Sequence, residues 1–344
     1  MPVESAEVPT IEELPKKVRV SLGSAIAIGL LNGRVDAEPT TAYLMTYREA
    51  KCTANCGFCP QARQSRGKAD MLSRVSWPVF DTKTVINSLQ KTASNGKIRR
   101  VCFQALNYPE VFSNLQMLAN AIRQQVKAPI SVSCQPLTVG NIELLAEAGF
   151  ERVGIPLDAA TEEIFNKIKG AEVGGPYRWK RQLQLLGNAV RVFGKNHVST
   201  HLIAGLGETE KEMVNIIQWC KQEGVLPALF AFTPIAGTAM EKNPQPPVQS
   251  YRRIQLARYL IVHRIATQKN MRFDENGCLT DFGVGKRTLT RIIRAGKPFL
   301  TSGCTNCNRP FYNEKPSGPI YNYPRELAKK EVEEVQASLD YGWK

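Results

Sequence analysis

The residues best suited to chemistry are three cysteines in the segment KCTANCGFCPQAR, namely Cys52, Cys56 and Cys59. They directly follow a short apolar run, and their Cys-x3-Cys-x2-Cys spacing allows three thiolates to surround one group. Iron–sulfur clusters are held by cysteine thiolates and normally take four of them. Because only three lie close together here, the pattern predicts a four-iron, four-sulfur cluster in which one iron keeps an open coordination site.

An open iron on a reducible cluster can chelate the amino and carboxylate groups of S-adenosylmethionine, and reduction would then break the sulfonium. The alternative is a zinc site, since close cysteine spacings also make zinc modules. Zinc would need a fourth ligand, but the segment holds no further Cys or His, and the chain's histidines are the distant His197, His201 and His263. The spacing therefore favours the cluster.

A second group of cysteines lies late in the chain. Cys278 stands in DENGCLTD, and Cys304 and Cys307 stand in TSGCTNCNRPFYNE. This stretch is rich in proline from Gly296 onward, and such a loop is usually either disordered or pinned by something. The three thiols predict a metal group that pins the tail: either an auxiliary four-iron, four-sulfur cluster or a structural zinc.

The elements that position these cysteines alternate regularly between Thr41 and about Arg264, where short apolar runs are followed by longer amphipathic stretches. This alternation is typical of β-α units on a parallel sheet. The predicted strands are 41–47, 98–105, 129–136, 152–159, 197–205 and 226–234. The main predicted helices are 83–93, 109–126, 141–149, 179–194, 210–224 and 249–264.

Six such units are too few for a closed eight-stranded barrel. The predicted fold class is therefore α/β, a partial (β/α)6 barrel with catalytic groups at the C-terminal ends of its strands. We expect an N-terminal helical extension at 1–40, with its helix in VRVSLGSAIAIGLLNGR (18–34), the barrel at 41–265, and a C-terminal extension with a cysteine-bearing loop at 266–344.

Composition limits the cellular setting and the partners. No apolar run is long enough to cross a membrane, and the acidic N-terminus does not resemble a secretory signal, so we expect a cytoplasmic protein with reduced thiols. Cys102, Cys134 and Cys220 stand singly in apolar segments and are expected in the core. The net charge of +14 favours an anionic partner, but no basic run is interleaved with aromatic residues, so no nucleic acid is expected.

The cysteine segment resembles the radical S-adenosylmethionine superfamily, and the resemblance covers roughly residues 41 to 264. The family's Cys-x3-Cys-x-aromatic-Cys form is matched with Phe58 as the aromatic residue, whose backbone contacts the adenine in that family. A second match is HLIAGLGETEKE, in which Gly205, Gly207 and Glu208 occupy the turn beside the adenine after the fifth strand.

Other cofactor contacts implied by the resemblance are less fully matched. FQALNYPE (103–110) replaces the family's glycine-rich turn after the second strand. Asp158 fits a ribose-binding carboxylate, although an N-cap of the helix beginning TEEIF is an equally simple role. Arg178, with Lys180 and Arg181 beside it, could supply a cation for the cofactor's carboxylate or could lie solvated on its helix.

Within the superfamily the chain is most similar to the sulfur-inserting branch, in CPQ (59–61) and FTPIAGTAM (232–240). Biotin synthases bind a second cluster inside the barrel with three strand cysteines and an arginine. Cys102 and Cys134 match the first two positions, but Ser199 stands at the third. Biotin synthase-like sulfur insertion into dethiobiotin is therefore the alternative function.

Lipoyl synthases instead carry an auxiliary cluster as a sacrificial sulfur source, and the bacterial type places its three cysteines before the radical motif. Here Cys278, Cys304 and Cys307 follow the barrel, which resembles the two-protein lipoyl synthases of archaea. The resemblance implies two 4Fe-4S clusters and S-adenosylmethionine as cofactors, with Ser302 or another C-terminal hydroxyl as fourth ligand of the auxiliary cluster.

The implied reaction starts with one electron from a ferredoxin-like donor and proceeds through a 5′-deoxyadenosyl radical that takes hydrogen from an octanoyl chain. The octanoyl group would arrive on an acidic carrier, a glycine-cleavage H protein or a lipoyl domain, and a second lipoyl synthase protein would share the work. Two further alternatives are another auxiliary-cluster radical enzyme acting on nucleic acid, and a zinc-stapled scaffold without activity.

Overall fold

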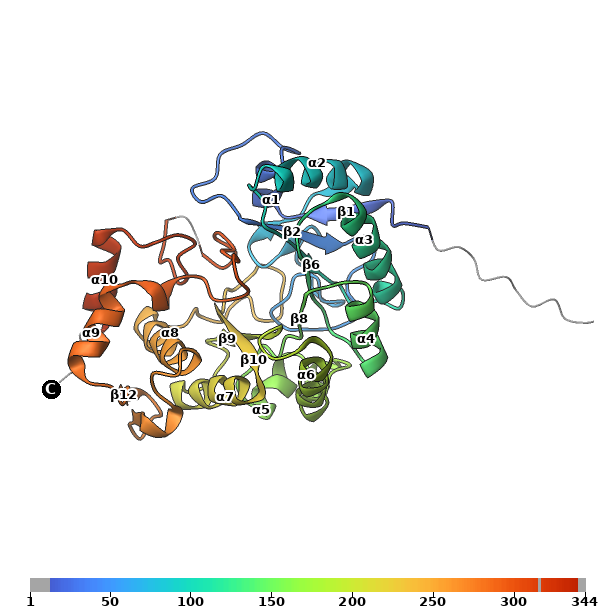
Figure 1. Cartoon of the computed structure of the whole chain (residues 1–344). Coiled ribbons are helices and arrows are strands. Elements are labelled where there is room, and N and C mark those ends of the chain that lie inside the picture. The colour runs from blue at the N-terminus through green and yellow to red at the C-terminus, as the bar shows by residue number, and fades with distance from the viewer. Residues whose placement is uncertain (1–12, 315–316, 340–344) are drawn as a thin grey trace, which may run out of the picture.

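The computed structural model describes residues 13–314 and 317–339, in which helices arc around the outside of an eight-stranded sheet (Figure 1). Six neighbouring strands of this sheet run parallel, in the order β10-β9-β8-β7-β6-β2. These strands are β2 (Thr41–Thr46), β6 (Arg100–Gln104), β7 (Ile130–Ser133), β8 (Arg152–Gly154), β9 (Val198–Ala204) and β10 (Val225–Ala231). Each falls within or beside a predicted run, so the predicted partial barrel of six β-α units is confirmed.

The N-terminal segment differs from its prediction. Lys17–Val20 forms strand β1, which pairs antiparallel with β2 on one side and with β5 (Val79–Asp81) on the other. Only Leu22–Ala27 is helical, as α1. The predicted helix over 18–34 is therefore wrong at its start, because the β-branched Val18 and Val20 bury themselves on the sheet. Residues 1–12 of the predicted extension lie outside the described part of the chain.

The helices cover the outer face of the parallel strands with their apolar sides. On α3, for example, Leu115, Leu118 and Ile122 are buried at the spacing that a helix facing a sheet requires. The outer helices are α2 (Thr82–Ser94), α3 (Val111–Gln125), α4 (Val139–Glu147), α6 (Trp179–Phe193), α7 (Glu210–Glu223) and α8 (Val248–Val262). The remaining short elements of this part are β3 (Met71–Leu72), β4 (Val75–Ser76), α5 (Glu162–Ile168) and η1 (Ala171–Val173).

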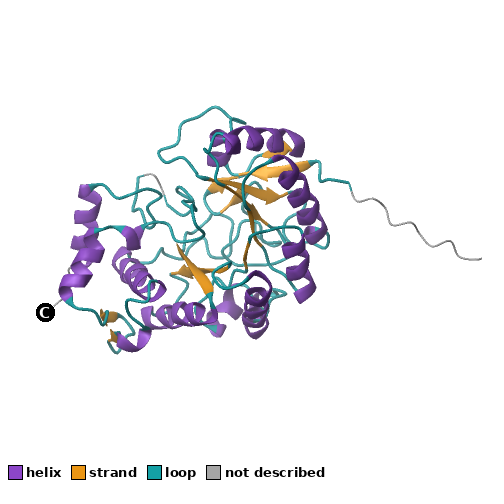
Figure 2. Cartoon of the chain, viewed as in Figure 1, coloured by secondary structure: helices purple, strands orange, loops and turns teal. Residues whose placement is uncertain are grey.

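Each parallel strand presents alternate residues to the helices and to the inside of the barrel. On β9, Val198, Thr200 and Leu202 are buried under the helices, whereas the intervening residues line an internal cavity. The register aligns Tyr43 of β2 with Cys102 of β6. It continues from Cys102 to Ser131 of β7 and then to Arg152 of β8, so these four residues share one level of the barrel. Loops fill the space inside the arc of helices (Figure 2).

The C-terminal part packs on α8 and then returns to the barrel. Its elements are η2 (Gln268–Asn270), β11 (Arg272–Phe273), β12 (Leu279–Asp281), α9 (Lys286–Arg294), η3 (Lys297–Phe299) and α10 (Lys329–Leu339). Between η3 and α10 a long loop is anchored by buried polar side chains: Arg252 donates to the carbonyl of Tyr321 at 2.6 Å, and Tyr251 donates to Asn322 at 3.0 Å. No helix in the described ranges combines the length and apolarity needed to cross a membrane.

Candidate active site

One cavity inside the barrel is lined by both cysteine groups. Cys52, Cys56 and Cys59 line it from the loop after β2, at the C-terminal ends of the strands. Cys304 and Cys307 line it from the C-terminal loop. We call the region that holds the three radical-motif cysteines (Cys52, Cys56 and Cys59) the upper part of the cavity. The region that holds the two tail cysteines (Cys304 and Cys307) is the lower part.

The upper cysteine loop is held in shape by its own backbone, by one lysine and by hydrogen bonds to the segment after β6 and to the end of α5, such as that from the amide of Gly57 to the carbonyl of Ile168 at 2.7 Å. The amide of Cys59 donates to the carbonyl of Cys56 at 3.0 Å, and Lys51 donates to the carbonyls of Pro60 and Gly67 at 3.0 and 2.7 Å. The sulfur of Cys52 accepts a hydrogen bond from the amide of Asn107 at 3.2 Å. The amide of Asn107 thus points at a sulfur that lines the cavity.

Burial raises the pKa of Cys56 to about 12 and also raises the pKa of Cys59 strongly. Without a cation these thiols are therefore neutral at physiological pH. Binding iron would displace their protons, because only thiolates are ligands. Three half-buried cysteines that line one cavity, one of them with an N–H donor beside its sulfur, fit an iron–sulfur cluster.

Neither cysteine group has the arrangement of a zinc site. Within 13–314 and 317–339, no three His, Cys, Asp or Glu side chains form a group that could hold a single metal ion. A cubane differs from such an ion because its thiolates bind different irons and stand further apart. The zinc alternatives proposed from the sequence gain no support from the structure.

Phe58 and the glycine turn lie beside the upper cysteines, as the sequence predicts for neighbours of a cofactor. Phe58 lines the cavity and packs in one apolar cluster with Leu206 of the turn after β9. Gly205 has φ +101°, and a side chain there would collide with the ring of Pro246, so the turn requires glycine. Gly207 also has a positive φ, +115°.

The carboxylate of Glu208 is used inside that same turn. It accepts from the amides of Gly205 at 2.7 Å and Leu206 at 3.0 Å. Burial raises the pKa of this carboxyl group. Glu208 therefore fixes the shape of the turn, whose Leu206 side chain packs in the same apolar cluster as Phe58.

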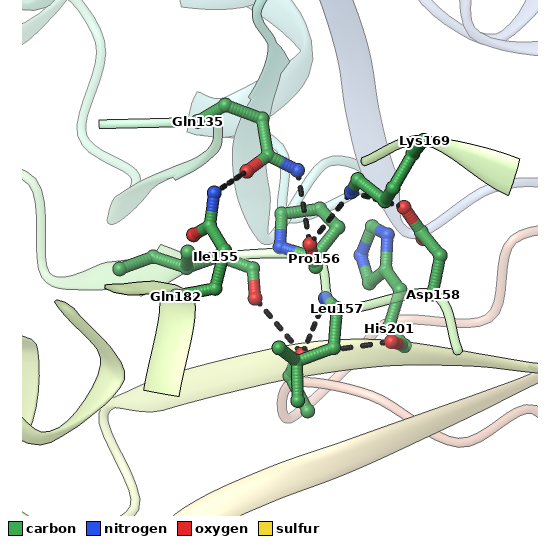
Figure 3. Close-up of polar contacts among 9 residues, drawn as sticks. Gln135, Ile155, Pro156, Leu157, Asp158, Lys169, Gln182 and His201 are labelled. Carbon is green, nitrogen blue, oxygen red and sulfur yellow. Dashed lines mark hydrogen bonds and ion pairs between the residues drawn. The ribbon is translucent and has the colours of Figure 1, made fainter. Parts of the chain in front are cut away.

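Asp158 lines the cavity and forms a buried ion pair with Lys169, with 2.6 Å between Oδ2 and Nζ (Figure 3). The side chains of Lys169 and Asp158 are only 1% and 8% exposed. Lys169 also donates to the carbonyl of Pro156 at 2.9 Å. The alternative role for Asp158 as a helix cap is wrong, because Thr161 caps α5 through the amide of Ile164.

Sequence reasoning missed Lys169. It stands in IFNKIKG, where nothing distinguishes it from the exposed Lys167 two residues earlier. The predicted cation, Arg178, is instead exposed and donates to the carbonyls of Gly175 and Tyr177 at 2.9 and 2.8 Å. Since Arg178 is not part of the cavity wall, the prediction that it faces the cofactor is corrected here, and Lys169 is the cation beside the upper cysteines.

The lower part of the cavity is built around Tyr43. Its hydroxyl lies 3.3 Å from the sulfur of Cys307 and accepts from the amide of Arg309 at 3.1 Å. The guanidinium of Arg309 stacks over the ring of Phe230 at 4.0 Å. The strand residue Cys102 also lines this part; the sequence predicts a core position for it and, by the resemblance to biotin synthases, a match to a cluster-binding strand cysteine.

Cys278 is not brought to the other tail cysteines. It lies between β11 and β12, where its amide donates to Asp274 at 2.8 Å. Burial and the nearby carboxylates of Glu210 and Asp274 raise its pKa. The predicted grouping of Cys278 with Cys304 and Cys307 is therefore not what the structure shows.

Ser302 also departs from its predicted role. Its hydroxyl is buried and accepts from the amide of Leu229 on β10 at 2.7 Å. This bond ties the C-terminal loop to the sheet edge. The serine therefore anchors the loop, and its hydroxyl is not part of the cavity wall.

Comparison with known proteins agrees with this architecture. The model of the Radical SAM superfamily matches residues 50–220. A biotin synthase of Mycobacterium leprae (strain Br4923) is 25% identical over 171 residues, which cover 49% of this chain and 46% of that protein. A biotin synthase of Cutibacterium acnes is 25% identical over 215 residues, covering 59% of this chain and 56% of that protein. The chain thus spans about half the length of the curated relatives it matches.

Among solved structures, the FeFe-hydrogenase maturase HydG from Carboxydothermus hydrogenoformans superposes with a TM-score of 0.51 at 17% sequence identity. The match covers 64% of this chain and 51% of that chain. At this identity the likeness concerns the fold alone.

Proposed function

This chain belongs to the radical SAM superfamily, and from that premise we propose that it is a sulfur-inserting enzyme, one component of a lipoyl synthase. Its substrate would be a protein-bound octanoyl chain, and its sulfur would come from an auxiliary 4Fe-4S cluster. The observation that carries the proposal is the single cavity lined by the radical-motif cysteines at one end and by Cys304 and Cys307 at the other.

The upper cysteines would hold the first cluster, which when bound supplies the electron that cleaves S-adenosylmethionine to a hydrogen-abstracting radical. The chain's own residues position this cofactor and keep water out. Phe58 and the turn at Gly205 offer an apolar wall and backbone, and the Asp158–Lys169 pair offers buried charges beside the cysteines. A dry interior suppresses side reactions of a reactive intermediate.

The carrier and the donors are part of the proposal. The net charge of +14 suits docking of an acidic carrier, such as a glycine-cleavage H protein or a lipoyl domain. A ferredoxin-like donor would supply the electron, and a second lipoyl synthase protein would complete the two insertions.

The docking can be tested at the loop that follows the cavity-lining Cys59–Gln61. Arg63 and Arg66 are exposed there, and changing both to glutamine should weaken carrier binding and lower its salt dependence. The matched control replaces the exposed Arg287 and Arg291 of α9, which removes the same charge elsewhere. Equal affinity of both variants for the carrier would contradict docking at this mouth.

Biotin synthase-like insertion into dethiobiotin is the second candidate, supported by the curated relatives and by Cys102 and Cys134 in the cavity wall. Two features favour the lipoyl assignment over it. Ser199, which pairs with Gly154 in the sheet, stands where the third strand cysteine would be, and the tail cysteines enter the same cavity.

The deciding experiment supplies the reconstituted protein with S-adenosylmethionine, a reductant and either an octanoylated lipoyl domain or dethiobiotin. We expect the mass of the octanoyl peptide to increase by the mass of inserted sulfur, with no biotin formed. Biotin without thiolated peptide would overturn the lipoyl assignment. Cofactor cleavage without any sulfur product from either substrate would overturn both candidates and leave a radical enzyme of another kind.

A further inference from the structure

We infer that the second cluster is bound by Cys102, Cys304 and Cys307, one cysteine from a barrel strand and two from the C-terminal loop, and that Cys278 takes no part. The inference rests on the proposed function only in that this function calls for a second cluster. The ligand set itself follows from the positions of the thiols.

Tyr43 shows how close the strand and the loop come. Tyr43 and Cys102 are register partners on the adjacent strands β2 and β6, and both side chains point into the cavity. The Tyr43 hydroxyl lies 3.3 Å from the sulfur of Cys307. Cys304 is held beside Cys307 by a backbone hydrogen bond of 2.9 Å from the amide of Cys307. The three thiols thus line the same lower part of one cavity from two segments.

The surroundings of Cys102 agree with this position. Its sulfur accepts a hydrogen bond from the side-chain amide of Gln104 at 3.4 Å, and its register partner on β7, Ser131, lines the same cavity. Cys102 therefore lies between β2 and β7 at the level of the barrel where Tyr43 meets Cys307.

An independent observation is the positive charge around the lower part. Arg152 and Arg309 line the cavity together with Cys304, and Arg100 precedes Cys102 by two residues on the same face of β6. Arg100 is 5% exposed and bonds Glu151 at 2.6 Å, while its Nε and Nη1 have no hydrogen-bond partner within the described ranges. A buried guanidinium group with N–H groups that lack acceptors suits an anionic occupant nearby. A cluster held by three thiolates is such an occupant.

The two competing cysteines lack these features. Cys278 sits among Asp274, Glu210 and Arg253 by the β11–β12 hairpin, away from the cavity. Cys134 lines the cavity just beyond the end of β7, three residues past Ser131, which is the register partner of Cys102. Neither is placed to complete a set with Cys304 and Cys307.

The test is the iron and labile sulfide bound per chain after anaerobic reconstitution, together with the Mössbauer spectrum, for single cysteine-to-serine variants. We expect about eight irons in the unaltered protein and about four in each of Cys102→Ser, Cys304→Ser and Cys307→Ser. Cys278→Ser and Cys220→Ser should keep about eight. Cys220 is a buried cysteine of α7 and controls for the loss of a thiol from the core.

Retained cleavage of S-adenosylmethionine shows that a variant has folded and kept its first cluster. A full iron content in Cys102→Ser would overturn the inference, as would a halved content in Cys278→Ser or in Cys134→Ser. An unaltered protein that holds about four irons would overturn it as well. Failure of this inference can be distinguished from failure of the proposed function. If only the proposed function is wrong, the variants still show the expected iron contents, but the octanoyl peptide gains no sulfur.

Discussion

The two ends of the cavity use the same side chain in opposite settings. In the upper part, three cysteines come from eight consecutive residues and lie beside the Asp158–Lys169 pair, whose charges neutralise each other. In the lower part, cysteines from a strand and from the C-terminal loop lie near Arg100, whose Nε and Nη1 have no hydrogen-bond partner among the described residues. The difference indicates that the buried charges of the upper part are paired within the protein, whereas the lower part keeps N–H groups free for an anionic occupant.

The largest contrast is expected from removing the cysteines themselves. Replacing Cys52, Cys56 and Cys59 by alanine should abolish 5′-deoxyadenosine formation, because no cluster would remain to reduce the cofactor. Replacing Cys304 and Cys307 should leave that cleavage intact and abolish sulfur insertion. 5′-Deoxyadenosine and the sulfur-containing product can both be followed by chromatography and mass spectrometry. Loss of cofactor cleavage in the variant without Cys304 and Cys307 would contradict separate roles for the two parts of the cavity.

The charge balance of the upper part can be broken with Lys169→Met. This leaves Asp158 buried and unpaired, which should lower the free energy of unfolding by about 3–5 kcal/mol. Lys167→Met on the same helix is the control, because Lys167 pairs with Glu163 on the surface and its loss should not change stability measurably. Denaturant unfolding measures both. Equal stabilities would show that the buried pair does not hold the upper part together.

Between the two ends, His201 should make stability depend on pH. Burial lowers its pKa to about 4, whereas the unfolded chain restores a value near 6.5. The unfolded state therefore binds an extra proton between these values, so stability is full above pH 6.5 and falls by up to about 3 kcal/mol as the pH drops toward 4. His201→Gln should lack this part of the slope. Parallel stability curves for the two proteins between pH 4 and 6.5 would contradict the assignment.

The smallest effect concerns the lower part alone. Tyr43→Phe removes the hydroxyl that meets Cys307 and the amide of Arg309, which should cost about 1 kcal/mol and loosen iron held by the tail cysteines. Tyr321→Phe is a matched control, since its hydroxyl donates to the carbonyl of Pro246 away from the cavity. We expect a similar loss of stability there with full iron content. Equal iron contents in the Tyr43→Phe and Tyr321→Phe variants would show that the Tyr43 hydroxyl does not help to hold iron in the lower part.

The sequence predicts the upper part of the cavity better than the lower part, because the residues of the upper part are closer together along the chain. The upper cysteines, Phe58 and the Gly205 turn are local patterns, and the six parallel strands follow from local periodicity. Lys169 was missed because its role depends on contact with the distant Asp158, and its immediate neighbours suggest a surface lysine. Cys102 was matched to a strand cysteine of biotin synthases, but its place beside the tail cysteines depends on contacts that the local sequence does not show. Cys278 was grouped with Cys304 and Cys307 because all three follow the barrel in the sequence, but closeness in sequence does not establish closeness in space.

The contact between Tyr43 and Cys307 also has a consequence for the order in which the molecule matures. It joins residues 264 positions apart in a chain of 344, so it closes a loop of about three quarters of the chain, and contacts of such length form late in folding. The upper cysteine loop makes its own long-range hydrogen bonds with Asn107, Ile168 and Gly237, all of which precede the C-terminal loop in the chain. We therefore expect that a chain lacking its C-terminal loop, either nascent or cleaved by a protease, can still form the radical although its proposed sulfur source is missing. Limited proteolysis followed by a cofactor-cleavage assay would test this.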